Sequence, residues 1–229
     1  GKDLKYARNL DKLGHFTASY LASTAFSDIL RLTHVPENWA LFGGAGLSVL
    51  NATIIEIKDG FAPYWGFSAY DEMANMLGAF YPVIQAKVPF LQNFNFKWSF
   101  DFDYRYDTEY FTYKQKTGSS DGYFFIDDYD RQYFWMTVDW ANLFCKDKQK
   151  YKFPYFFDFA IALSGNNLKT LNANKKEGLE LYFGIDLNLT KLFKQKNVGY
   201  YICKYVNFYH LPMPALQVAP RGKGYWLMY

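Results

Sequence analysis

The chain has 229 residues, of which 50% are hydrophobic, 22% aromatic and 21% charged. This composition allows a folded core in one large domain or two small ones, and it excludes wholesale disorder. A formal net charge of +3, without a long Lys/Arg block, gives no field of the kind that nucleic acids require. We therefore expect no nucleic-acid partner.

Residues 1–92 predict about three apolar helices. The first is expected over 11–32, and a second begins near Pro36 and includes the uncharged, glycine-containing stretch 39–55. The third is expected over 68–81, with Ser68 as its N-cap. Helices this apolar are buried in protein or in lipid. We favour a compact bundle and keep a membrane-spanning 39–55 helix as the alternative.

Residues 93–229 predict antiparallel strands. From 94 to 106 every even position is aromatic and every odd position is polar, so one strand has an apolar face and a polar face. Hairpin-length polar connections join further runs of the same kind. The expected strands cover 94–106, 108–117, 121–128, 131–144, 153–164, 179–189, 197–210 and 222–229, about eight in all.

The apolar face of these strands decides between two kinds of barrel. The interior of an eight-stranded barrel holds side chains or one small ligand, so aromatic faces from several strands would overfill it. The final strand, with Tyr225, Leu227 and Tyr229 alternating, resembles the assembly signal of bacterial outer-membrane barrels. We therefore expect an α+β fold with a helical region at 1–92 and an eight-stranded, outer-membrane type β-barrel at 93–229. The alternative is a soluble sheet whose aromatic face packs on the helices.

The polar residues that can do chemistry lie in the helical region. Asp11 and His15 are one turn apart, as are Asp71 and Asn75. We take His15, Asp11, Glu56 and Asp71 as catalytic candidates and Lys12, Asp59 and Asn75 as binding candidates.

Three roles are open to this set. It can be a buried hydrogen-bond network that locks the bundle, which we favour, or His15 can act as a general base oriented by a carboxylate. The third role is a divalent-metal site. No P-loop, Rossmann or His-Glu-x-x-His motif is present, so we expect no cofactor, and the pattern itself assigns no metal ligand. The pairing of Cys145 and Cys203 is left open.

Three blocks carry a family resemblance: DKLGHF at 11–16, EIKDGF at 56–61 and GFSAYDEMANMLGA at 66–79. They are similar to the YfiM-like family of predicted periplasmic lipoproteins of unknown function, and distantly similar to VanZ-like membrane proteins. The resemblance covers about residues 11–80 and implies an envelope location. No lipobox cysteine lies near residue 1, so we do not expect lipidation from this sequence.

These observations favour a non-enzymatic protein of the Gram-negative cell envelope, at the outer membrane or its periplasmic face. We expect a structural or accessory-subunit role, with outer-membrane lipid and other envelope proteins as partners. A general porin is disfavoured because an eight-stranded barrel has no open channel. The alternatives are a hydrolase that acts on lipid or cell-wall material through His15, and a binder of a small apolar ligand.

Overall fold

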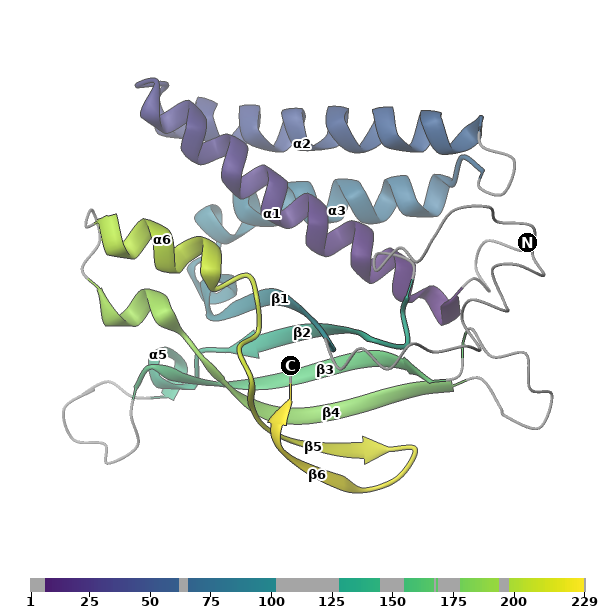
Figure 1. Cartoon of the computed structure of the whole chain (residues 1–229). Coiled ribbons are helices and arrows are strands. Elements are labelled where there is room, and N and C mark those ends of the chain that lie inside the picture. The colour runs from purple at the N-terminus through teal and green to yellow at the C-terminus, as the bar shows by residue number, and fades with distance from the viewer. Residues whose placement is uncertain are drawn as a thin grey trace. The chain divides into compact units, whose positions relative to one another are not determined.

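The computed structural model describes residues 7–61, 66–101, 128–144, 155–166, 168, 178–193 and 198–228 (Figure 1). The chain divides into a helical unit, Gly1–Gln92, and a sheet unit, Asn93–Tyr229. The fold is α+β, with the helices first in the chain and the antiparallel strands after them.

The helical unit consists of three long helices that pack pairwise against one another. They are α1 (Leu10–Leu32), α2 (Glu37–Gly60) and α3 (Ala69–Lys87), followed by a short 3-10 turn, η2 (Pro89–Asn93). The Ser68 hydroxyl accepts a hydrogen bond from Asp71 N at 3.0 Å, which confirms the expected N-cap of α3. The expected end of α3 before Pro82 is wrong, because the helix continues through the proline and packs Val83 against Leu41 and Ala45.

Small residues make the contacts between these helices. A Cβ at Gly44 on α2 would lie 2.6 Å from Ser27 N and 2.8 Å from Ser23 O on α1, so only glycine allows this approach. Ser48 on α2 donates a hydrogen bond to Ser19 O on α1 at 2.9 Å. Small and polar side chains therefore fill the interior of the helical unit.

Large apolar side chains lie on the exterior of the helical unit. Among the described helices, α2 is long and apolar enough to cross a membrane by length and composition, and 39% of its most apolar stretch is buried. Exposed residues include Trp39, Phe42, Leu50, Ile54 and Ile57 on α2 and Met73 and Leu77 on α3.

The sheet unit is an antiparallel meander of six described strands, in the order β1-β2-β3-β4-β5-β6 (Figure 1). Consecutive strands pair along the whole sheet. Its elements are β1 (Phe94–Phe100), β2 (Gln132–Val138), α5 (Trp140–Phe144), β3 (Phe157–Asn166), β4 (Gly178–Leu187), η5 (Leu189–Leu192), α6 (Val198–Val206), β5 (Met213–Ala219) and β6 (Lys223–Met228).

The expected closed, eight-stranded barrel is wrong for the described residues, where the sheet is open and has six strands. At the outer edge of β1, Trp98 N donates to Phe208 O at 2.9 Å and His210 N donates to Trp98 O at 3.0 Å. These bonds occupy backbone groups that a closing strand would need. The strands expected over 108–117 and 121–128 lie outside the described residues, as does Cys145.

Two expected strands are partly helical. The 131–144 segment forms β2 and then α5, and most of the 197–210 segment forms α6. The apolar residues of α6 recur at helical spacing, which defines a stripe along one side of the helix. Valine, isoleucine and tyrosine are also the residues that strands prefer, so the composition of this segment predicts a strand although its apolar residues have helical spacing. The stripe consists of Val198, Tyr201, Ile202, Tyr205 and Val206, and all five are exposed.

The two faces of the sheet have inverted polarity. The register places Lys97 opposite Trp135, Trp135 opposite Ala162, and Ala162 opposite Tyr182, so all four share one face. That face, the inner face, is buried. The other face, the outer face, is apolar and remains exposed at Phe159, Leu179, Phe183, Leu216, Val218 and Trp226.

Candidate functional site

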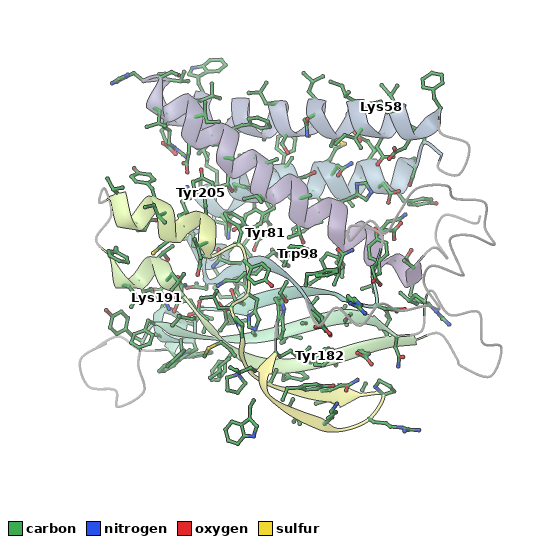
Figure 2. The ribbon with its side chains drawn as sticks, in the orientation of Figure 1. Lys58, Tyr81, Trp98, Tyr182, Lys191 and Tyr205 are labelled. Atoms are coloured by element: carbon green, nitrogen blue, oxygen red, sulfur yellow. The ribbon has the colours of Figure 1, made fainter. Side chains whose placement is uncertain are left out.

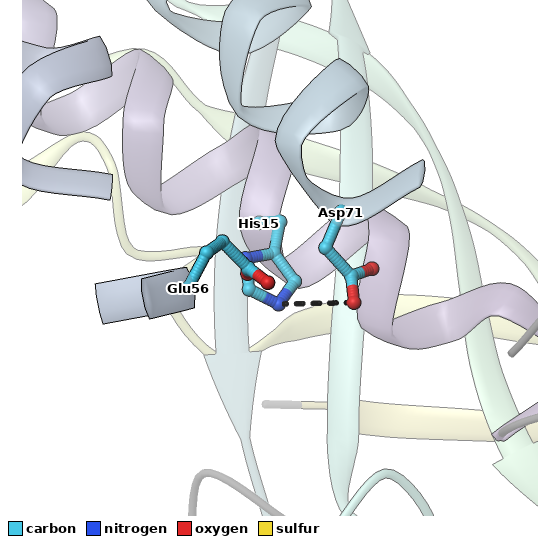
Figure 3. A group of neighbouring side chains, drawn as sticks. All are labelled: His15, Glu56 and Asp71. Atoms are coloured by element: carbon cyan, nitrogen blue, oxygen red, sulfur yellow. Dashed lines mark ion pairs between the residues drawn. The ribbon is translucent and has the colours of Figure 1, made fainter. Parts of the chain in front are cut away.

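The helical unit brings together one residue from each of its three helices. His15 on α1 has its Nδ1 atom 3.5 Å from Glu56 Oε1 on α2 and its Nε2 atom 4.0 Å from Asp71 Oδ2 on α3 (Figure 3). Glu56 is 2% exposed, whereas the His15 side chain is 28% exposed. The cluster is therefore buried on its carboxylate side and reachable from solvent at the imidazole.

Asn75 orients the His15 ring. The Nδ1 atom of His15 lies 3.2 Å from Asn75 Oδ1, which also accepts a hydrogen bond from Ser19 Oγ at 3.0 Å. Because Asn75 Oδ1 and Glu56 Oε1 are both acceptors, the Nδ1 atom carries a proton and donates. The other ring nitrogen, Nε2, is thereby directed to Asp71.

Lys12 supplies the ammonium group of the cluster. Its Nζ atom lies 2.9 Å from Asp11 Oδ2 and 2.6 Å from Asp71 Oδ1. The second oxygen of Asp11, Oδ1, is buried and has no hydrogen-bond partner among the described residues. Asp59 is half-buried near the end of α2. Among the described residues, it makes no hydrogen bond or ion pair to the cluster.

Burial dominates the electrostatics of the carboxyl groups. Desolvation raises the pKa of Glu56, although a hydrogen bond from Ser68 N and the nearby His15 lower it; the charges of Asp71 and Asp59 add to the rise. Desolvation also raises the pKa of Asp11, against the lowering effect of Lys12. The site thus holds carboxyl groups close together with few neighbouring cations.

The neighbouring hydroxyl groups are already engaged in the fold. Ser68 caps α3, Ser19 donates to Asn75, and Thr53 Oγ1 donates to Glu72 Oε1 at 2.6 Å. A nucleophile activated by His15 would need a free hydroxyl or thiol within hydrogen-bond reach. The geometry of the described residues therefore suits cation binding or structural locking better than covalent catalysis.

A second buried polar cluster lies in the sheet unit. The Nζ atom of Lys97 on β1 lies 2.5 Å from Asp186 Oδ2 on β4, and His210 Nδ1 lies 2.7 Å from Asp186 Oδ1. The His210 ring stacks on the Trp135 indole with centroids 3.8 Å apart. Burial lowers the pKa of both Lys97 and His210, while Asp186 acts in the opposite direction on each.

Two further groups, Lys191 and Asn188, extend this cluster at the start of β3. Lys191, labelled in Figure 2, lies 2.7 Å from Asp158 Oδ1, and Asn188 Nδ2 donates to Asp158 Oδ2 at 2.8 Å. The sequence pattern does place Lys97, Asp158 and Asp186 on polar strand faces. It does not reveal the cluster, because His210 comes from the segment after α6 that was expected to be part of a strand.

The fold and the two clusters define a two-unit α+β protein with buried charge in each unit. Residues 2–87 match the family described as predicted periplasmic lipoprotein (DUF2279), a little over a third of the chain. No curated protein and no solved structure gives a significant match. The helical unit is therefore similar to a periplasmic family of unknown function, which indicates a cell-envelope protein.

Proposed function

We propose that this protein is a non-catalytic component of the Gram-negative cell envelope that rests on outer-membrane lipid through the outer face of its sheet unit. Its role is structural or that of an accessory subunit. The proposal includes two finer points. The helical blocks are YfiM-like, and the protein lies at the outer-membrane side of the envelope.

The inverted polarity of the sheet carries the proposal. In a water-soluble sheet the apolar face is covered and the polar face is wet, whereas here Lys97 and Asp186 are buried and Phe183 is 46% exposed. Burying one such large apolar side chain contributes about 1.5–3 kcal/mol. A row of them across four strands therefore favours a low-dielectric partner strongly.

Helix α6 adds an interfacial element to the same unit. Its exposed stripe of Val198, Tyr201, Ile202, Tyr205 and Val206 is accompanied by Lys204. An apolar stripe of aromatic and aliphatic side chains beside a basic residue is typical of amphipathic helices that lie in the plane of a membrane interface. Tyrosine suits this position because its ring is apolar and its hydroxyl reaches water.

The described strands favour lying against lipid over crossing it. A tilted membrane strand needs roughly 9–11 residues, which β3 and β4 reach with 10 each, but β1, β2 and β5 have 7 and β6 has 6. Within hydrocarbon, the edge of β6, which pairs with no other strand among the described residues, would also leave backbone groups unsatisfied. A position at the membrane–water interface therefore suits these strands better than a position across the hydrocarbon core.

The main rival occupant of the outer face is the chain itself. The helical unit exposes Trp39, Phe42 and Leu50, so apolar surfaces of the two units can cover one another. A small apolar ligand is disfavoured, because the buried inner face is lined by charged groups and filled by Trp135 and Tyr182.

Flotation with vesicles of phosphatidylethanolamine and phosphatidylglycerol tests the proposal. The full chain is expected to float with the vesicles, and a double variant Phe183→Ser/Leu216→Ser to float less. An Arg221→Ser variant in the exposed turn between β5 and β6 is the matched control and should float like the native chain. A monodisperse, detergent-free native protein that stays out of the vesicle fraction would overturn the proposal.

A further inference from the structure

We propose that the helical unit binds a divalent transition-metal ion between His15 Nε2 and one carboxylate oxygen each of Glu56 and Asp71. The three residues come from three different helices (Figure 3), and a ring nitrogen of His15 and one carboxylate oxygen each of Glu56 and Asp71 all lie within 4.8 Å of one another. This inference goes beyond the lipid association proposed above and does not depend on it.

The orientation of the His15 ring is the first observation behind the site. Nδ1 hydrogen-bonds to Asn75 Oδ1 at 3.2 Å and has Glu56 Oε1 3.5 Å away, and because both oxygens are acceptors, a neutral ring presents its lone pair at Nε2. That lone pair faces Asp71 Oδ2, also an acceptor, at 4.0 Å. A cation placed between these two acceptors would be bound by both.

The distances fit a metal with small movements. Two atoms that each lie about 2.0–2.2 Å from one Zn²⁺ ion are roughly 3.3–4.4 Å apart, depending on the angle at the metal. The Nε2–Oδ2 separation of 4.0 Å lies inside this range, and the 4.8 Å limit of the cluster lies just outside it. Asn75 acts as the outer-shell partner that fixes which ring nitrogen is free.

The charge balance is the second observation. Asp11, Glu56 and Asp71 bring three carboxylates, and Lys12 brings one ammonium, which leaves a formal charge of −2 when His15 is neutral. Asp11 Oδ1 is buried without a hydrogen-bond partner among the described residues, and Asp11 is 3% exposed. Buried carboxylates in this excess are costly unless a cation compensates them.

The donor set selects the class of metal. Imidazole favours zinc and other late first-row ions, and carboxylates favour manganese and harder ions, so a mixed set of one imidazole and two carboxylates suits Zn²⁺ or Mn²⁺. The partial exposure of His15 gives the ion a route from solvent. It also leaves room for water as a further ligand.

Lys12 supplies a distinctive test, because its ammonium competes for Asp71. The Nζ–Oδ1 distance is 2.6 Å, so the lysine and the metal act on the same carboxylate. Removal of this positive charge should strengthen metal binding by about fivefold. A purely structural network would respond in the opposite way, by losing order without gaining a cation.

The experiment uses the full chain in detergent, stripped with EDTA and titrated calorimetrically with ZnCl₂ and with MnCl₂. We expect the native chain to bind one ion. The His15→Asn and Glu56→Gln variants should bind the ion at least about tenfold more weakly, which is on the order of the loss that removal of a metal-site residue causes. His34→Asn is the matched control, because His34 is exposed and has φ 62, which asparagine tolerates. It should bind like the native chain.

The Lys12→Gln variant keeps the test decisive even if a ligand variant does not fold. Tighter binding by Lys12→Gln supports the site, whereas unchanged or weaker binding by that folded variant overturns it. Absence of stoichiometric binding by the native chain also overturns it. So does equal binding by a folded His15→Asn variant.

Discussion

Gly78 on α3 lies directly against the backbone of Phe16 on α1. A Cβ at residue 78 would overlap the Phe16 carbonyl oxygen and lie 2.9 Å from the Phe16 Cα atom. His15 precedes Phe16, and Asn75 lies one turn before Gly78, so the same approach sets the 3.2 Å contact between His15 and Asn75. The absence of one side chain therefore positions the candidate site.

Gly78→Ala should destabilise the helical unit. The added methyl group meets rigid backbone, and overpacking of this kind costs about 1–3 kcal/mol or more. Gly46 is the matched control, because it is exposed on α2 and a Cβ there meets nothing within 4 Å. Gly46→Ala should instead stabilise the helix by about 0.5–1 kcal/mol. Urea unfolding followed by circular dichroism measures both, and equal effects would show that the close approach is absent.

Glu56 should contribute to stability mainly through its hydrogen bond to the start of α3. Its Oε2 atom accepts from Ser68 N at 3.2 Å, an interaction that glutamine can keep and leucine cannot. In EDTA we expect Glu56→Gln to unfold near the native midpoint. Glu56→Leu should lose about 1–3 kcal/mol, because a buried N–H is left unpaired. If Glu56→Leu is as stable as the native chain, the network does not lock the bundle.

Substitution of Lys97 alone should strongly destabilise the sheet unit. Its ammonium lies 2.5 Å from Asp186 and also donates to Asn207 Oδ1 at 2.9 Å. Lys97→Met leaves the buried Asp186 carboxylate uncompensated, and loss of one partner of a buried pair costs about 3–5 kcal/mol. The double variant Lys97→Met/Asp186→Leu should recover part of this loss. Additive losses in the double-mutant cycle would contradict a direct coupling.

The sheet unit should lose stability in mild acid through His210. Burial lowers the pKa of this imidazole, with Asp186 opposing the shift and Lys97 adding to it. The folded state therefore resists a proton that the unfolded chain accepts below about pH 6.5. The contribution is complete above that pH and is lost as the pH falls towards the lowered folded pKa.

The acid response is measured by comparison with His210→Gln. The free energy of unfolding of the native chain should fall more steeply below pH 6.5 than that of the variant. The comparison removes the contribution of Asp158, whose pKa is raised by burial and which acts with the opposite sign. Parallel pH profiles for the two proteins would show that His210 is not buried as a neutral group.

Local sequence signals predicted much of the helical unit. Three helices and the Ser68 cap follow from apolar stretches and a capping residue, and the i, i+4 spacing of Asp11 with His15 and of Asp71 with Asn75 predicts paired polar faces. The predicted end of α3 before Pro82 is wrong, because the packing of Val83 in the core outweighs the loss of one backbone hydrogen-bond donor at the proline.

The sheet unit shows what local pattern leaves open. Alternation predicts the two faces of β1, β3 and β4, because a strand always separates odd and even positions. Closure depends on which edges meet, and the pairing of Trp98 with Tyr209 is a contact between distant segments. The cluster of Lys97, Asp186 and His210 depends on the same long-range placement, so sequence spacing does not predict it.

The environment of the outer face of the sheet is the most direct test of the proposed lipid association. In a Cys145→Ser/Cys203→Ser background, Phe183→Cys on β4 and Arg221→Cys in the β5–β6 turn are each labelled with an environment-sensitive fluorophore. On addition of vesicles, we predict a blue shift at position 183 with quenching by lipid-borne nitroxide, and no change at position 221. A label at position 183 that already reports an apolar environment without lipid, and does not respond to vesicles, would contradict the proposal.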